Sequence, residues 1–381
     1  MSSVSNDATK LTRLNALLGD GKQLGSLADL ADLPVTRKDE LLKAQAENPP
    51  FGGHRPTGLS HIFQSPGPIY EPGLAQQDFW RFGRFMREVG MTAQDIVLNT
   101  FSYHFTPAGA MFETGARANG AVVLPTGPGS TNQQAEVAAA TGATAYAGTP
   151  DFLQIILDRA AETGVDLSAI KTAFVSAGPL FPTLRQAYAD RGIMCRQCYG
   201  TADVGLIAYE TATCINGMVI DDDVIVEIVS PGTGTPVPHG EIGEVVVTVL
   251  NPDHPIIRFS VGDLSAFATD VDQSGETRAR IVGWRGRADQ ATKVKGMFIR
   301  PEQVSKLVAG CADIMRARVE VSNDGTSDKI EVKLECASGD PQTFEPMIHE
   351  IIKLRSQVTM VEVGSLPRDG VLVSDLRDAP S

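Results

Sequence analysis

The stretch TAFVSAGPLFPTLRQAYADRGIMCRQCYGTADVG, residues 172–205, contains one complete strand–helix–strand unit. Within it, TAFVSAG (172–178) and MCRQCY (194–199) are short apolar runs typical of buried strands, and TLRQAYADRG (183–192) between them reads as a helix. Strands and helices that alternate at this spacing predict a largely parallel, doubly wound sheet.

The alternation extends toward the N-terminus through DIVLNTF (95–101), AVVLP (121–125), NQQAEVAAATG (132–142), AYAG (145–148) and FLQIILDRAAETG (152–164). Further along, residues 224–250 alternate apolar and polar positions around Gly- and Pro-rich turns, which predicts an antiparallel β unit. Another change of texture follows near Trp284, and the remaining 90 or so residues pair helices with a hairpin. We therefore expect an α/β fold: a large domain of layered α/β sheets with a β-barrel-like unit (1–285), then a small α+β domain (286–381). Residues 1–12 are expected to form a frayed leader.

Composition restricts the class of protein. The 381 residues include 33 Lys and Arg against 46 Asp and Glu, a formal net charge of −13, which argues against nucleic acid or an anionic membrane as a partner. The sequence has neither a signal-peptide pattern nor an apolar stretch of the roughly 18 residues that span a bilayer. Five cysteines fit a reducing compartment. We expect a cytoplasmic metabolic protein. Whether it forms a homodimer stays open, because the apolar face Trp80–Met86 could belong either to the core or to a contact surface between subunits.

A series of polar and aromatic residues has the chemistry of a nucleotide site. Tyr199, beside Gly200 at a strand end, can lay its ring against a flat base, and Asp263 can accept both hydroxyls of a ribose. Arg287, at the domain border, can donate to the same sugar or to a phosphate.

Two other residue sets are less specific. His104 lies in the central sheet region between Tyr103 and Phe105, and it fits either packing or catalysis. Cys195 and Cys198 form a CxxC pair, with Cys214 following, but alternate residues of a strand face opposite ways and no second pair completes a zinc set. A zinc site is therefore disfavoured but stays open.

Three segments together, QCYGTADVG (197–205), IIRFSVGDLSAF (256–267) and WRGRADQATKVKGMFIRPEQV (284–304), resemble the adenylate-forming superfamily, specifically its phenylacetate–coenzyme A ligase-like branch. The segments LPVTRKDELL and PPFGG near the start also match this branch. The resemblance implies an AMP-forming ligase that activates a carboxylic acid with ATP and Mg²⁺ and then transfers it to coenzyme A. It also implies that the small C-terminal domain is mobile.

The same resemblance implies roles for individual residues. Tyr199 would stack on adenine, Asp263 and Arg287 would hold the ribose, Asp203 would serve Mg²⁺, and Asp289 would be the hinge. Further nucleotide-site positions are Ser65, Gly67, Ser176, Ala177, Gly178, Pro179 and Gly200, and Thr201 and Lys295 join the catalytic set. The acid pocket would include Tyr103, His104, Thr106, Gly109 and Tyr146, whose aromatic edge suggests an aryl or apolar acid.

Three departures from the family pattern fall on the chemistry. The phosphate-loop segment reads HIFQSPGPIYEPG (61–73), whose prolines lack N–H donors. Asp203 stands where Glu is usual, and the family's late lysine is missing, because the last lysine of the chain is Lys353. One alternative is therefore a degenerate homologue that binds nucleotide, acyl-adenylate or acyl-CoA without efficient adenylation. Another is a phosphate site re-formed around Ser65, Gly67 and Tyr70, and Lys293 or Lys295 could replace the late lysine.

Overall fold

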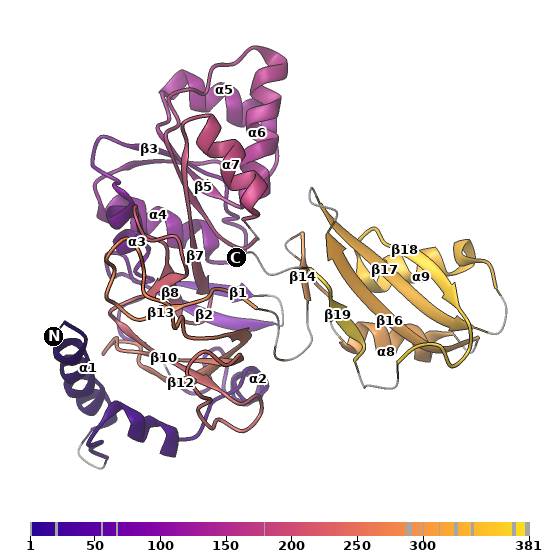
Figure 1. Cartoon of the computed structure of the whole chain (residues 1–381), viewed down its shortest axis with the longest axis horizontal. Helices are drawn as coiled ribbons and strands as arrows, with labels where there is room; N and C mark the ends of the chain where they lie inside the picture. Colours follow the sequence, from indigo (N-terminus) through magenta and orange to yellow (C-terminus); the bar gives the residue numbers. More distant parts are fainter. Residues whose placement is uncertain are drawn as a thin grey trace. The chain divides into compact units, whose positions relative to one another are not determined.

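The computed structural model describes residues 2–19, 22–54, 56–65, 68–178, 180–285, 288, 292–295, 297–299, 301–311, 313–323, 327–336, 339–367 and 371–377. The chain divides into two compact units, Met1–Trp284 and Arg285–Pro380. Figure 1 shows the first unit in indigo to orange and the second in orange to yellow. The division falls one residue before the boundary expected from the sequence.

An eight-stranded sheet forms the centre of the first unit, with the strand order β13-β9-β8-β7-β6-β5-β3-β4. Five neighbouring strands are parallel: β4 (Val122–Pro125), β3 (Ile96–Asn99), β5 (Ala145–Gly148), β6 (Thr172–Val175) and β7 (Met194–Thr201). Three antiparallel strands extend the sheet beyond β7: β8 (Gly205–Tyr209), β9 (Met218–Ile220) and β13 (Arg280–Ile281). The predicted doubly wound sheet is confirmed, with an antiparallel extension.

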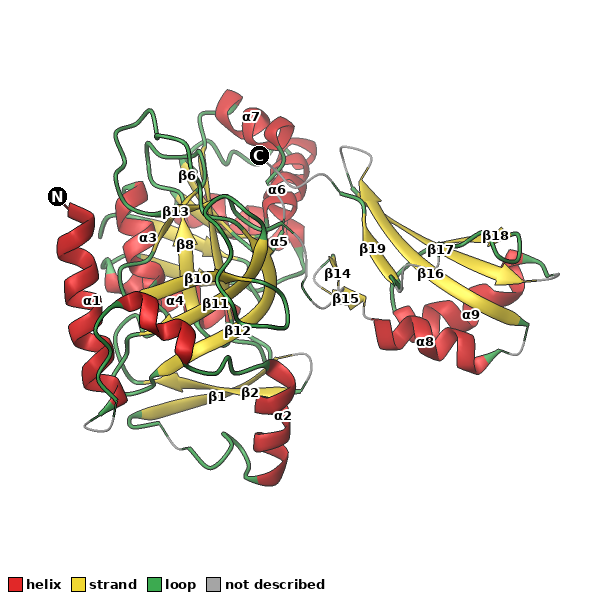
Figure 2. Ribbon diagram, turned by 60° about the horizontal axis from the view of Figure 1, so that its bottom comes forward, coloured by secondary structure: helices red, strands yellow, loops and turns green. Residues whose placement is uncertain are grey.

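Helices cover both faces of the parallel strands (Figure 2). On one face, α3 (Phe82–Val89) and α4 (Ala108–Ala118) pack Phe85 and Phe112 against strand residues such as Phe174. On the other face lie α5 (Thr131–Thr141), α6 (Pro150–Thr163) and α7 (Pro182–Asp190). Because strand residues alternate in direction, Phe174 joins the first cluster and its neighbour Val175 the second. Trp80, Phe82, Phe85 and Met86 are all buried, so this face is core.

Two smaller antiparallel sheets complete the first unit. One has the order β10-β11-β12, from β10 (Val224–Val229), β11 (Gly243–Val249) and β12 (Ile256–Ser265). The other is a hairpin of β1 (Leu59–Ser65) and β2 (Ile69–Leu74), against which α2 (Lys38–Glu47) packs. The segment compared above with a phosphate loop therefore runs mainly as paired strands, in which Phe63 lies opposite Glu71.

The N-terminal segment forms a helix, α1 (Ser2–Leu18), so the expectation of a frayed leader was wrong. Its polar residues give little helical signal, and tertiary contacts stabilise it instead. Leu14 is fully buried with Leu30, which lies in the 3-10 helix η1 (Leu27–Asp32), and with Leu250. Lys10 donates to the Val224 carbonyl at 2.7 Å, which ties the helix to the start of β10.

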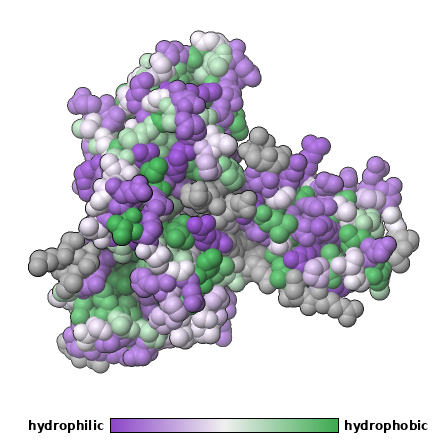
Figure 3. Space-filling view, in the orientation of Figure 1, coloured by the Kyte–Doolittle hydropathy of each residue, from purple (hydrophilic) through white to green (hydrophobic). Residues whose placement is uncertain are grey.

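The second unit is an α+β domain with its own core. Its sheet has the order β18-β17-β16-β19, from β18 (Gln357–Val361), β17 (Asp328–Cys336), β16 (Ile314–Asn323) and β19 (Val373–Asp375). Helices α8 (Pro301–Gly310) and α9 (Pro341–Ile352) cover one face of it (Figure 2). A short hairpin, β14 (Thr292–Val294) and β15 (Met297–Ile299), precedes α8. Hydrophilic residues occupy much of the visible face of this unit (Figure 3).

Candidate functional site

The carboxyl ends of four neighbouring parallel strands bring most of the candidate residues to one edge of the sheet. Residues 100–103 follow β3, Gly148 ends β5, Ser176–Gly178 follow β6, and Tyr199–Thr201 end β7. In open α/β sheets, ligands bind at this edge. Ala177 has a φ of 62°, a left-handed conformation that is uncommon outside glycine and that collects at functional sites. Ser176 Oγ donates to the Cys198 carbonyl at 2.9 Å, which fixes this turn against β7.

Tyr199 and Asp263 meet although they are 64 positions apart. The Tyr199 hydroxyl donates to Asp263 Oδ2 at 2.8 Å, and the indole of Trp284 donates to Asp263 Oδ1 at 3.2 Å. The contact joins the end of β7 to β12, and both residues are largely buried there. A carboxylate held between two donors near an aromatic ring can exchange those donors for ligand hydroxyls.

A second polar cluster contains Lys38, Ser65, Glu71 and Asp203. Lys38 Nζ, at the start of α2, lies 2.9 Å from Asp203 Oδ2; the Asp203 side chain is 5% exposed and that of Lys38 is 35% exposed. Ser65 Oγ donates to Glu71 Oε2 at 2.8 Å across the β1–β2 hairpin. Burial, together with the negative charge of Asp203, raises the pKa of Glu71 to about 8. The sequence analysis included Ser65 and Asp203 but missed Glu71 and Lys38.

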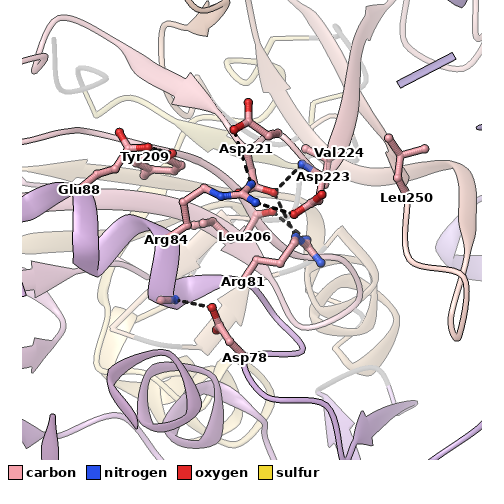
Figure 4. A network of polar contacts seen from close by, with 12 residues as sticks. Asp78, Arg81, Arg84, Glu88, Leu206, Tyr209, Asp221, Asp223, Val224 and Leu250 are labelled. Atoms are coloured by element: carbon pink, nitrogen blue, oxygen red, sulfur yellow. Dashed lines mark hydrogen bonds and ion pairs between the residues drawn. The ribbon is translucent and has the colours of Figure 1, made fainter. Parts of the chain in front are cut away.

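A network of buried charges supports the turn that carries Asp203 (Figure 4). Arg81 Nη2 donates to the carbonyls of Val204 and Leu206 at 2.5 and 2.9 Å, immediately after Asp203. Its Nε lies 3.2 Å from Asp221, which also pairs with Arg84 at 2.7 Å. Because Asp221 is fully buried, these contacts hold the β7–β8 turn rigidly against α3.

Residues of the expected acid pocket fall into two groups. Tyr103, His104 and Phe105 are exposed in the segment after β3, and the Phe105 carbonyl accepts from the Gln64 backbone N–H at 2.9 Å, which joins this segment to β1. Thr106 lies half-buried in the same segment. Tyr146, by contrast, is fully buried in the core, and its hydroxyl donates to the Thr149 carbonyl at 3.0 Å.

Glycines allow close approach at this edge. A Cβ on Gly109 would lie 2.8 Å from the Tyr103 ring, and one on Gly200 would lie 2.7 Å from the Gly205 carbonyl. Thr201 Oγ1 accepts from the Val204 backbone N–H at 3.4 Å inside the same turn. Small residues are therefore required where β7 turns into β8 and where the segment after β3 enters α4.

The cysteines of the CxxC pair lie on opposite faces of the sheet. Cys195 belongs to the core cluster beneath α5–α7, and Cys198 to the cluster beneath α3 and α4. Burial raises the pKa of the Cys195 thiol to about 12 and that of the Cys214 thiol to about 11. Among the described residues, no group of three or more Cys, His, Asp or Glu side chains is arranged as metal ligands.

Several expected site residues lie outside the described residues: Gly67, Pro179, Arg287 and Asp289, together with the side chain of Lys293. Lys295 is described; it is exposed at the end of β14, with a φ of 49°. Trp284 is a further residue that the sequence analysis did not assign, although it opens one of the three matching segments. The segment LPVTRKDELL contains Lys38, so the resemblance indicated its position without its partner.

Comparisons with known proteins show which sequences this chain resembles. A family model described as AMP-binding enzyme matches residues 75–249. A phenylacetate–coenzyme A ligase from Aromatoleum evansii is 29% identical over 329 residues, which cover 82% of this chain and 73% of the relative. Another from Thermus thermophilus is 25% identical over 349 residues, covering 87% and 76%. No helix of the described residues is long and apolar enough to cross a membrane.

Solved structures show the same fold. The chain matches a 2-hydroxyisobutyryl-CoA ligase in complex with 2-HIB-AMP and CoA at a TM-score of 0.81 and 21% identity, over 99% of this chain and 91% of that chain. It also matches the amide bond synthetase McbA from Marinactinospora thermotolerans at a TM-score of 0.62 and 18% identity, over 84% and 68%. The matching segments, the fold and these relatives lead to one conclusion: residues 75–249 match the AMP-binding enzyme family, and the chain is similar over most of its length to phenylacetate–coenzyme A ligases.

Proposed function

We propose that this protein is an AMP-forming ligase that joins a carboxylic acid to coenzyme A. In the first step an acid oxygen attacks the α-phosphorus of ATP, which forms an acyl-adenylate and releases pyrophosphate. In the second step the thiol of coenzyme A attacks the acyl carbon and AMP leaves. The observation that carries the proposal is the contact between Tyr199 and Asp263 at the carboxyl edge of the parallel strands, in a chain that is similar to known ligases.

The residues at that edge have separate tasks in the proposal. Asp263 accepts the ribose hydroxyls in place of the Tyr199 and Trp284 donors, and the Tyr199 ring lies against adenine beside the Ser176–Gly178 turn. Thr201 borders the reacting carboxylate. From the second unit, Arg287 assists at the ribose, Asp289 is the hinge of a mobile lid, and Lys295 supplies positive charge. These last assignments rest on the resemblance.

The residues present also fit a divalent cation. Oδ1 of Asp203 and Oε1 of Glu71 are buried, and within the described part of the chain they have no hydrogen-bond partner. Carboxylate oxygens are the ligands that Mg²⁺ prefers, usually with phosphates completing its shell. Bound there, Mg²⁺ would neutralise phosphate charge, while Lys38 keeps Asp203 oriented.

We further propose an aryl or otherwise apolar acid as the substrate. Tyr103 is 37% exposed and Phe105 66% exposed in the segment after β3, so their rings are available to an apolar group. We expect the enzyme to work in the cytoplasm, which supplies ATP and coenzyme A.

A second candidate is a degenerate homologue that binds nucleotide or acyl-CoA without making the adenylate. Two observations favour it. Residues 59–65 and 69–74 pair as strands and the Ser65 hydroxyl is bonded to Glu71, so the described residues of this segment offer few donors to a polyphosphate. The late lysine of the family is also missing, since no lysine follows Lys353.

The experiment that separates the candidates measures AMP release by the full chain with ATP, Mg²⁺, coenzyme A and a panel of aryl and aliphatic acids. A ligase releases AMP only when acid and coenzyme A are both present, whereas the degenerate homologue releases none. Calorimetry with ATP and Mg²⁺ provides the binding control: Asp263→Ala should abolish the heat, and Tyr199→Phe, which keeps the ring, should retain it. A wild-type protein that is folded but binds no ATP would overturn the ligase proposal.

A further inference from the structure

Glu71 and Asp203 present a combination that structural pairing does not explain. Glu71 is 3% exposed and the Asp203 side chain 5% exposed, yet each has one oxygen that lacks a hydrogen-bond partner among the described residues. An unpaired buried carboxylate oxygen is costly, and such groups in a native fold indicate a ligand or an ion that completes the site.

The other oxygen of each carboxylate is already held. Lys38 Nζ binds Asp203 Oδ2 at 2.9 Å, and Ser65 Oγ binds Glu71 Oε2 at 2.8 Å. These contacts fix both side chains, and Asp203 Oδ1 and Glu71 Oε1 have no hydrogen-bond partner in the part of the chain that the structure describes. Burial, and after it the negative charge of Asp203, raises the pKa of Glu71 to about 8.

Rigid elements position the two carboxylates. Glu71 lies on β2, and its neighbour Tyr70 exchanges two hydrogen bonds with the buried Gln45 side chain of α2, each 2.8 Å long. Lys38, at the start of the same helix, reaches Asp203 in the β7–β8 turn. Helix α2 therefore contacts both the hairpin that carries Glu71 and the turn that carries Asp203.

We propose that Glu71 and Asp203 together bind one divalent cation of the Mg²⁺ class, and that they do so before any nucleotide arrives. The inference rests on the proposed function, which offers these two carboxylates to the metal, and it adds that the ion binds to them without a nucleotide. It names Glu71, from the segment that stands in place of a phosphate loop, as the second protein ligand. The cation, rather than loop N–H groups, then provides the positive charge that draws a polyphosphate to this edge.

The ligand chemistry agrees with this class of ion. Two carboxylate oxygens and a nearby hydroxyl are hard donors that suit Mg²⁺ and Mn²⁺ and exclude a preference for soft metals. Mg²⁺ typically keeps several waters and takes one or two protein carboxylates, so a set of two acids is sufficient. The ammonium of Lys38 pairs with the outer oxygen of Asp203 and can remain in place.

The test titrates the full chain with Mn²⁺ in the absence of nucleotide and follows free Mn²⁺ by electron paramagnetic resonance, with Mg²⁺ as competitor. The wild type should bind one equivalent, and Glu71→Gln should bind at least about tenfold more weakly, because the loss of even an outer-shell partner of a metal site typically costs about 10–100-fold in affinity. Asp203→Asn should show a comparable loss. The matched control is Asp78→Asn: Asp78 is also a buried carboxyl with an unpartnered Oδ1 in the described structure, but it lies outside this cluster.

A wild type that binds no Mn²⁺ without nucleotide would overturn the inference, as would equal affinities of wild type and Glu71→Gln. Should Glu71→Gln fail to fold, thermal unfolding of the wild type decides the matter. Mn²⁺ should raise its midpoint, and Asp203→Asn should abolish that rise; a wild type that shows no rise refutes the proposal. Coenzyme A-dependent AMP release is measured in parallel. If the protein releases AMP with Mg²⁺ but binds no metal in the absence of nucleotide, this inference is rejected and the ligase proposal stands.

Discussion

Replacing Asp221 with asparagine should destabilise the first unit strongly, because this carboxylate neutralises two buried guanidinium groups. It is fully buried, and it lies 3.2 Å from Arg81 and 2.7 Å from Arg84 (Figure 4). Removing one partner of a buried ion pair costs about 3–5 kcal/mol. Asp223 still contacts Arg84 at 2.7 Å, so we expect the lower end, about 3 kcal/mol.

The adjacent Asp222 provides the matched control. Its side chain is 43% exposed and lies 3.9 Å from Arg84, so Asp222→Asn should change the free energy of unfolding by less than about 1 kcal/mol. Both variants remove one negative charge from the same short run of acidic residues. The difference between their unfolding free energies therefore reports the effect of burial and not that of net charge.

Urea unfolding followed by tryptophan fluorescence is the appropriate assay. The chain has two tryptophans, Trp80 and Trp284, and both belong to the first unit, so the signal reports that unit. A loss below about 1 kcal/mol for Asp221→Asn, or equal losses in the two variants, would refute the reasoning that burial makes this pair strong.

Three further predictions concern the site. Lys38→Met should lower the free energy of unfolding by about 2 kcal/mol, less than the loss of a fully buried pair, because the Lys38 side chain is 35% exposed. Adding Asp203→Asn to this variant should recover much of the loss. If urea unfolding shows that the losses of the two single variants simply add, the pairing is contradicted. Gly148→Ala should lower the free energy of unfolding by about 1–3 kcal/mol, because the new Cβ would collide with the Tyr146 hydroxyl. An unchanged thermal unfolding midpoint would contradict this prediction. Burial raises the pKa of Asp78 from its ordinary value of 3.8 to about 7, so the stability of the wild type should fall relative to that of Asp78→Asn as the pH rises from about 4 to 7. A difference between the two unfolding free energies that does not change with pH would contradict this prediction.

The parallel sheet could be predicted from local sequence because its strands are short, apolar and separated by helices of suitable length. The strand at 172–178 and the helix at 183–192 were located to within a few residues, as β6 and α7. Helix α1 was missed, since its polar residues form a helix only where Leu14 and Lys10 can pack on a distant strand.

The candidate site was predictable only where short motifs match the family. Tyr199 and Asp263 could be named as candidates, but their 2.8 Å contact links residues far apart in sequence. Glu71 gave no signal, because a single glutamate in a Pro-rich segment has no periodicity or motif. Its importance emerges from burial beside Asp203, which depends on how the hairpin packs on α2.

The sequence by itself determined the alternation of strands and helices, the acidic balance and the family motifs, because each depends on neighbouring residues. Only the tertiary structure decided which charges are buried together. It placed Lys38 on Asp203, closed Ser65 onto Glu71 and separated Cys195 from Cys198 across the sheet. The physical reason is that burial and long-range pairing set the electrostatics of a site, and both arise only when distant segments pack.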